Sequence, residues 1–297
     1  AYAMYSRLVG LGDVYKRQDS NRIILGSGSD EVLLFAALAF CQDGDEILHA
    51  NHGFEMYSIV SKVVGAVPKK IKEDVNFNLN IENLIDQTND ATKVIYIASP
   101  NNPTGTYLSR DQLVKLMNSI SKNIIVVIDG AYVEYVQKDD YDKGFSLTDE
   151  YENIILTRTF SKTYGLAALR VGWCYTSQKI ADIINKIKPP FNTTTISQSL
   201  AIKALEDKEH IENSVKLNSE IKDWFEKELK LLNIKTRQTE GNFTLIETSE
   251  EEAEKISNHL MNDGIIIRRL NSYNLPNFLR ISIGTKEEMN LTVESLK

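Results

Sequence analysis

Residues 93–112 read KVIYIASPNNPTGTYLSRDQ and combine a strand, a tight loop and the start of a helix. The apolar run KVIYIAS predicts a buried strand. The two prolines and the glycine of SPNNPTG predict a tight loop, from which Asn102 is expected to project into a cleft. Ser109 and Gln112 have the spacing of a helix capping box. A strand that leads through a short loop into a helix is the repeating unit of an α/β fold.

Similar strand-like and helix-like runs alternate from Asn21 onward. The strands are continuous apolar runs, and the helices between them are amphipathic. This pattern predicts a mainly parallel sheet with helices on both faces. Ligands of such sheets bind at the carboxyl ends of the strands. The strand-like runs are residues 22–26, 46–50, 93–99, 123–129, 153–157 and 171–176, and helices are expected from Ser29 and from Glu55.

The pattern of expected helices and strands changes after residue 198. A long charged amphipathic helix is expected at about 207–232, and shorter segments follow it: NFTLIE, a helix around 250–262, GIIIRR and FLRISIG. We therefore expect a large domain over residues 19–206 and a smaller α+β domain over residues 207–297, which begins with the long connecting helix.

Residues 1–18 have neither helical nor strand periodicity, and they run abruptly into NRIILGSGSDE. Within them, GLGDVYKRQ resembles the translated end of a transposon-based sequencing adapter. We treat this segment as a suspect artefact and leave it out of the functional interpretation. The alternative is a genuine but irregular N-terminal arm.

The composition of the 297-residue chain disfavours several classes of partner. A net charge of −7 disfavours nucleic acid or an anionic membrane as the main partner. No apolar run is long enough to cross a bilayer. Cys41 and Cys174 have no metal or redox spacing, and the four histidines form no zinc signature, so no metal site is predicted. We expect reduced thiols and a cytoplasmic protein.

Polar clusters follow several of the predicted strands. In GSGSDE, the backbone amides of Ser29 and Asp30 could hold a phosphate at a helix N-terminus, although such turns are also common helix caps. In DGAY, Asp129 either ends a strand or is a buried carboxylate that needs a cation. In TFSKTYGLAALR, Lys162 stands among hydroxyls with Arg170 behind it, which fits either a surface turn or a Schiff-base lysine beside a phosphate site.

Taken together, the clusters complement the parts of pyridoxal 5′-phosphate. This cofactor has a phosphate, a pyridinium nitrogen, a 3′-oxygen and an aldehyde, and the clusters offer a phosphate cradle, an anion, hydrogen-bond donors and a lysine. An anionic Asp129 would keep the ring nitrogen protonated, so that the ring can accept electrons when a substrate loses its α-proton.

The motifs SPNNPTG, DGAY, TFSK and the arginine after GLAAL resemble those of the fold-type I aminotransferases, and the resemblance extends from about residue 21 to the end of the chain. HGFEMY and FLRISIGT narrow the resemblance to the histidinol-phosphate aminotransferases. It implies a large pyridoxal-phosphate-binding domain and a smaller C-terminal domain. The implied activity, in histidine biosynthesis, interconverts imidazole-acetol phosphate plus L-glutamate with L-histidinol phosphate plus 2-oxoglutarate.

The resemblance also implies roles for individual residues. Lys162, Asp129 and Tyr132 are the implied catalytic residues. The implied cofactor contacts are Ser29, Asp30, Phe54, Asn102, Asp129, Tyr132, Thr159, Ser161, Lys162 and Arg170. The implied substrate contacts are Arg280, which is expected to bind the carboxylate of glutamate, Asn102, and Arg268, which is either a substrate-phosphate contact or a solvated charge.

Two departures from the family pattern stand out. Many relatives have glutamate where DGAY has Gly130, a position without a cofactor contact. Relatives also have a longer N-terminal arm with a tyrosine that reaches the partner's cofactor in a homodimer, and that arm is missing here or replaced by the suspect segment. The remaining alternatives are an aromatic aminotransferase, a threonine-phosphate decarboxylase, or an inactive module or fragment that only binds the cofactor.

Overall fold

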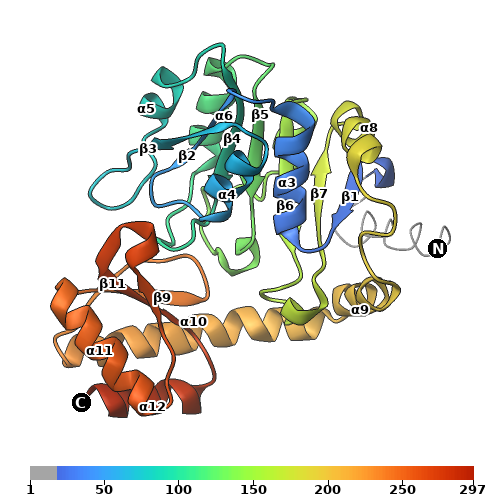
Figure 1. The fold of residues 1–297 in the computed structure, drawn as a ribbon. Helices are drawn as coiled ribbons and strands as arrows, with labels where there is room; N and C mark the ends of the chain where they lie inside the picture. Colours follow the sequence, from blue (N-terminus) through green and yellow to red (C-terminus); the bar gives the residue numbers. More distant parts are fainter. Residues whose placement is uncertain (1–18) are drawn as a thin grey trace.

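The computed structural model describes residues 19–297, so the suspect segment 1–18 lies outside the described residues. A seven-stranded sheet forms the larger part of the molecule, with strand order β1-β7-β6-β5-β4-β2-β3 (Figure 1). These strands are β1 (Ile23–Gly26), β2 (Glu46–Ala50), β3 (Val67–Ile71), β4 (Thr92–Ala98), β5 (Ile125–Asp129), β6 (Ile154–Thr159) and β7 (Gly172–Thr176).

The prediction of a mainly parallel sheet is confirmed. The pairs β3–β2, β2–β4, β4–β5 and β5–β6 are parallel, whereas β7 is antiparallel to both β6 and β1. Every residue of β5 and β6 is buried, as expected for central strands with a helical layer on each side. The carboxyl ends of β4, β5 and β6 therefore meet at one edge of the sheet.

Helices cover both faces of this sheet because alternate strand residues point to opposite sides. Ile95 and Ile97 of β4 pack into one core, and Val94 and Tyr96 into the other. The first core lies under α5 (Ile81–Asp86), α6 (Arg110–Ser119), α7 (Phe145–Glu150) and α9 (Thr195–Glu206). The second lies under α3 (Ser29–Phe40), α4 (Met56–Val63) and α8 (Gln178–Ile187). The predicted capping box starts α6: Ser109 and Gln112 exchange both hydrogen bonds.

The long helix α10 (Lys208–Leu231) runs from the large sheet to a second, four-stranded sheet (Figure 1). This sheet is antiparallel, in the order β10-β11-β9-β8. Its elements are β8 (Lys235–Arg237), β9 (Phe243–Glu247), α11 (Glu250–Asn262), β10 (Arg268–Leu270), β11 (Leu275–Ser282) and α12 (Lys286–Leu296). Apolar residues of α10, α11 and α12 form a core on one face of it.

The predicted helix at 207–232 is confirmed as α10. In GIIIRR, only the last two residues lie in a strand, because the backbone of Gly264 has a φ of +81° and the chain first turns out of α11. The loop between β3 and α5 contacts the second sheet: the ring of Phe77 meets that of Phe278 in β11 at a centroid distance of 5.2 Å. The domain division at residues 206 and 207 stays a prediction. Within residues 19–297, no helix is both long enough and apolar enough to cross a membrane.

Candidate active site

The predicted site residues meet at the carboxyl edge of the large sheet. A cavity of about 220 Å³ opens there, between the ends of β4, β5 and β6 and the start of α3. Every residue that we expect to contact the cofactor lines it: Ser29, Asp30, Phe54, Asn102, Asp129, Tyr132, Thr159, Ser161, Lys162 and Arg170. Ala98, Pro100, Ala131 and Ala167 complete the wall.

Lys162 follows β6 and is the nucleophile candidate of this cavity. Its Nζ lies 5.2 Å from the ring centroid of Tyr132, and no described residue forms a hydrogen bond or ion pair with it. Burial, followed by the nearby charge of Arg280, lowers the pKa of Lys162 below its usual value. A lowered pKa increases the neutral fraction of the amine, which is the form that attacks carbonyl carbons.

The end of the cavity near α3 combines hydroxyls, a guanidinium and free helix amides. Thr159 Oγ1 accepts a hydrogen bond from the backbone amide of Ser161 at 3.1 Å and donates to Ser161 Oγ at 2.9 Å. Arg170 NH1 lies 3.5 Å from the same Oγ, and its NH2 pairs with Asp30 at 3.3 Å. No side chain caps α3, so its first amides point toward this end without an intrahelical partner.

Close backbone contacts fix the shape of this end of the cavity. We call it the phosphate cradle, and it consists of Thr159, Ser161, Arg170 and the backbone amides of Ser29 and Asp30. A Cβ on Gly172 would lie 2.4 Å from the backbone nitrogen of Ser29, so only glycine lets β7 pack against the turn before α3. Gly28 has a φ of +82°, and a Cβ there would meet Arg170 NH2 at 2.3 Å. Glycines at both positions therefore bring the start of α3 and Arg170 together.

Asp129, the last residue of β5, is 4% exposed. Its carboxylate accepts hydrogen bonds from Thr157 Oγ1 at 2.8 Å and from the Tyr57 hydroxyl at 2.9 Å. Burial raises the pKa of Asp129, and these two hydrogen bonds oppose that rise. Neither donor was predicted from the sequence. Two features of the sequence could have indicated them. Tyr57 lies three residues after Phe54 in HGFEMY, and Thr157 lies two residues before Thr159, on the same face of β6.

The second sheet contributes Arg280 of β11 to this site. Its NH1 donates a hydrogen bond to Asn102 Oδ1, and its guanidinium lies 5.2 Å from the ring centroid of Phe243. Its Nε is buried without a hydrogen-bond partner, and no acidic residue of the described part pairs with it. A partly buried guanidinium without a carboxylate partner is suited to bind an anionic ligand.

Arg268 lies opposite Arg280 in the pairing of β10 with β11. Arg268 NH2 pairs with Glu55 at 3.6 Å, and just over half of the Arg268 side chain is exposed. Neither arginine lines the 220 Å³ cavity itself. Glu55 directly follows Phe54, so the Arg268 ion pair nevertheless borders the cavity wall.

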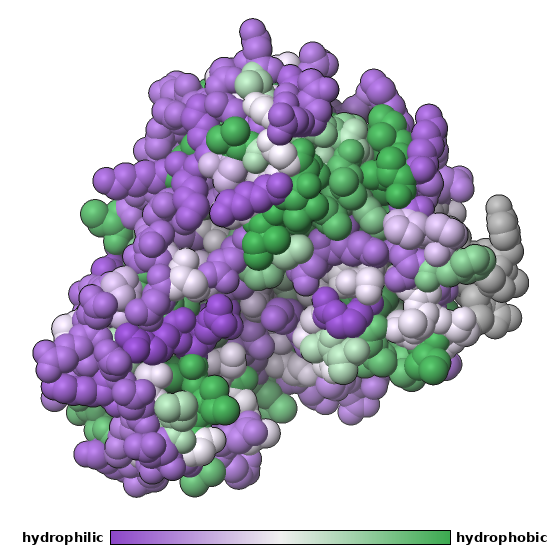
Figure 2. Space-filling model, viewed as in Figure 1, coloured by the Kyte–Doolittle hydropathy of each residue, from purple (hydrophilic) through white to green (hydrophobic). Residues whose placement is uncertain are grey.

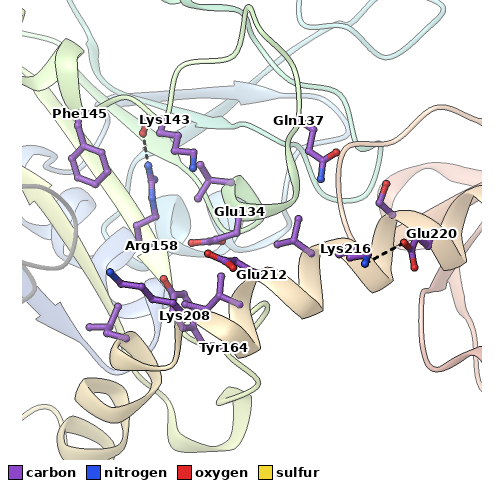
Figure 3. Close-up of a pocket in the computed structure, with 15 residues that line it drawn as sticks. Glu134, Gln137, Lys143, Phe145, Arg158, Tyr164, Lys208, Glu212, Lys216 and Glu220 are labelled. Atoms are coloured by element: carbon purple, nitrogen blue, oxygen red, sulfur yellow. Dashed lines mark hydrogen bonds and ion pairs between the residues drawn. The ribbon is translucent and has the colours of Figure 1, made fainter.

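A larger cavity, of about 640 Å³, lies beside the start of α10 and contains none of the predicted site residues (Figure 3). It is lined by a mixture of acidic, basic and apolar side chains, among them Glu212, Lys208 and Leu205. Arg158 on its wall donates to the backbone oxygen of Lys143 (Figure 3). It also donates to the backbone oxygen of Thr157 at 2.7 Å. The guanidinium fills the space that a side chain at Gly130 would need. Size alone therefore does not identify the reactive site, because the smaller cavity holds the nucleophile and its partners.

Comparison with known proteins agrees with this geometry. The family model for aminotransferase class I and II matches residues 4–296. A histidinol-phosphate aminotransferase from Pelagibacter ubique is 41% identical over 275 residues, which is 91% of this chain and 76% of that protein. Another from Zymomonas mobilis is 40% identical, over 91% of this chain and 74% of that protein.

A solved structure has the same fold. It is a histidinol-phosphate aminotransferase from Sinorhizobium meliloti in complex with pyridoxal 5′-phosphate, with a TM-score of 0.93 and 24% sequence identity. The superposition covers 100% of this chain and 81% of that one. With a family model that matches almost the whole sequence, and relatives this similar over most of their length, this chain belongs to the class I and II aminotransferases.

Proposed function

We propose that this chain catalyses the transfer of an amino group between L-glutamate and imidazole-acetol phosphate, which yields L-histidinol phosphate and 2-oxoglutarate. One observation carries the proposal: a single cavity brings together an unpaired lysine, a buried carboxylate and an uncapped helix N-terminus, with an arginine free of acidic partners beside it. The two curated relatives described above carry the name of that activity.

The cofactor is pyridoxal 5′-phosphate, and the residues present fit it. Lys162 and Arg280 both lack a partner for their charge within the described part of the chain, and Asp129 lacks a cation. Such unpaired groups are costly in an empty protein but favourable once a ligand of opposite charge or reactivity binds. The related protein from Sinorhizobium meliloti is solved with this cofactor.

We infer the following assignments. Lys162 would hold the aldehyde end covalently, Asp129 the ring nitrogen, and Phe54 the ring face. Tyr132 and Asn102 would donate to the 3′-oxygen. The phosphate would lie at the cradle formed by Thr159, Ser161, Arg170 and the amides of Ser29 and Asp30.

When bound, the cofactor supplies an electron-withdrawing ring that accepts electrons as the substrate loses its α-proton. The chain then has two tasks. Lys162 Nζ takes the proton from the substrate's α-carbon, which requires the neutral amine that its burial favours. Arg280 binds the substrate carboxylate and so orients the α-carbon toward the amine. Arg268 is our candidate contact for the phosphate of the second substrate.

The related aromatic aminotransferase and threonine-phosphate decarboxylase activities are not favoured, because the curated relatives described above are histidinol-phosphate aminotransferases. A catalytically inactive module is also disfavoured. A protein that only bound the cofactor would have no use for Arg280, which lies outside the cofactor cavity with an unpartnered Nε.

We propose that the protein is a homodimer and that it is located in the cytoplasm. Figure 2 shows apolar side chains over α3 and α4, and the exposed fractions of Leu38, Ile59 and Val63 are 48%, 50% and 62%. A contiguous apolar surface of this kind favours burial against a second subunit. Both cysteines are free, which is consistent with a reducing compartment.

The test combines absorbance with turnover. Wild-type protein with pyridoxal phosphate should develop the absorbance band of a lysine-bound cofactor, and L-histidinol phosphate should bleach it. Lys162→Ala should lose both this band and turnover, whereas Lys143→Ala, a lysine of the other cavity, should keep them. Turnover of aromatic amino acids in preference to histidinol phosphate, or normal turnover by Lys162→Ala, would refute the proposal.

A further inference from the structure

The carboxylate of Asp129 is held by two hydroxyl donors that come from different elements. Thr157 of β6 donates to Oδ1 at 2.8 Å, and Tyr57 of α4 donates to Oδ2 at 2.9 Å. No described Lys, Arg or His forms an ion pair with this carboxylate. Each oxygen is therefore fixed by one neutral donor, and the orientation of the carboxyl plane is set by the two together.

Packing makes the Tyr57 donor rigid. Tyr57 is 1% exposed, and its ring stacks on that of Tyr96 with a centroid distance of 4.9 Å and an interplanar angle of 4°. Tyr96 belongs to β4, the neighbour of the strand that ends at Asp129. The hydroxyl of Tyr96 donates to the backbone oxygen of Leu33 at 2.7 Å, so it holds α3 rather than the carboxylate.

Electrostatics gives these hydrogen bonds a chemical consequence. Burial raises the pKa of Asp129, and the charge of Asp30 adds to that effect. The donors Thr157 and Tyr57 oppose it, as does the more distant charge of Arg158. Hydrogen bonds to a carboxylate are stronger than those between neutral groups, so each donor favours the ionised form.

We propose that Tyr57 is a positioning residue that keeps the Asp129 carboxylate ionised and directed toward the ring nitrogen of the cofactor, with Thr157 as the second support. The inference rests on the proposed function and deepens it. Only an ionised, correctly oriented Asp129 pairs with a protonated ring nitrogen. The chain thus uses a tyrosine outside the cofactor cavity to select the protonation state of the group inside it.

A purely structural role for Tyr57 gives a different expectation, and Tyr96 is the matched control. Both tyrosines are 1% exposed, they stack on each other, and each donates one buried hydrogen bond. Tyr57→Phe and Tyr96→Phe therefore remove the same atom from the same core. Only the first removes a donor from Asp129.

The experiment measures the dissociation constants of the full-length apoprotein for two ligands. One is pyridoxal phosphate, and the other is its carbocyclic analogue, in which a C–H group replaces the ring nitrogen. Tyr57→Phe should weaken pyridoxal phosphate binding about tenfold and change analogue binding by less than about twofold. Thr157→Val should act in the same direction. Tyr96→Phe should leave the ratio of the two constants unchanged.

The positioning role would be overturned if Tyr57→Phe left the ratio of the two dissociation constants unchanged, whether both affinities fell equally or neither fell. If Tyr57→Phe does not fold, the ratio for Thr157→Val decides, since both donors act through the same carboxylate. Failure of the wild-type protein to bind pyridoxal phosphate at all would instead overturn the proposed function and this inference with it. The wild-type titration therefore distinguishes the two failures.

Discussion

Arg280 of the second sheet donates a hydrogen bond to the side-chain oxygen of Asn102, in the loop that follows β4 of the first sheet. Because Asn102 Oδ1 accepts from Arg280, its amide nitrogen is the atom left to donate to a ligand. A residue expected to bind substrate thus also orients a residue expected to bind the cofactor. The contact joins positions 178 residues apart in the chain.

Arg280→Ala should raise KM for glutamate and 2-oxoglutarate by about 100-fold, because the substrate carboxylate loses a charged hydrogen-bonding partner. The dissociation constant for pyridoxal phosphate should rise by only about threefold, since Asn102 loses its orientation but remains present. Steady-state kinetics and a cofactor titration measure the two effects. Arg237→Ala, which removes a guanidinium already paired with Glu247 at 2.6 Å, is the control and should change neither by more than about twofold. An unchanged KM in Arg280→Ala would contradict the carboxylate role.

Arg268 and Glu55 allow the phosphate contact to be tested in both directions. Arg268→Ala should raise KM for histidinol phosphate about tenfold and leave KM for glutamate unchanged, because only the first substrate has a phosphate. Glu55→Gln should lower KM for histidinol phosphate, since Glu55 competes for Arg268 at 3.6 Å. Equal effects of Arg268→Ala on both substrates would show that Arg268 does not recognise the phosphate.

Asp129 should make the stability of the apoprotein depend on pH. Burial raises its pKa in the folded state above the ordinary value of 3.8. The folded state then binds a proton that the unfolded state has released, so the contribution of Asp129 to stability falls as the pH rises from 3.8 toward the folded pKa. Asp129→Asn removes this titration, and its stability relative to wild type should increase over that range. Urea unfolding of both apoproteins across pH tests this; a difference that does not change with pH would contradict it.

Gly172→Ala should disturb the phosphate cradle. Its Cβ would lie 2.4 Å from the Ser29 nitrogen and 2.6 Å from the Gly28 carbonyl carbon, so backbone must shift. We expect a loss of about 1–3 kcal/mol in the free energy of unfolding and about tenfold weaker binding of pyridoxal phosphate. Gly264→Ala is the control, because Gly264 has a φ of +81° and open space around it. It should cost about 1 kcal/mol without affecting cofactor affinity. Cofactor affinity unchanged in Gly172→Ala would contradict the cradle.

Much of the fold could be predicted from local sequence. The apolar runs that became β4, β5 and β6 are buried on both sides, and such strands differ clearly from their surroundings. Strand β3 was missed, because its sequence VPKKI has a proline and two lysines. It lies at an edge of the sheet, where one side is open and no continuous apolar run is needed.

The sequence by itself determined the alternation of strands and helices, the loops at the strand ends, and the residue types that a phosphate, a ring nitrogen and an aldehyde require. Those features are local, since propensity, capping and turn chemistry act over a few residues. Only the tertiary structure decided that Tyr57 and Thr157 hold Asp129, that Arg268 pairs with Glu55, and that Arg280 reaches Asn102. These contacts depend on strand order and on how the second sheet lies against the loops of the large domain, and neither is encoded in the spacing of residues along the chain.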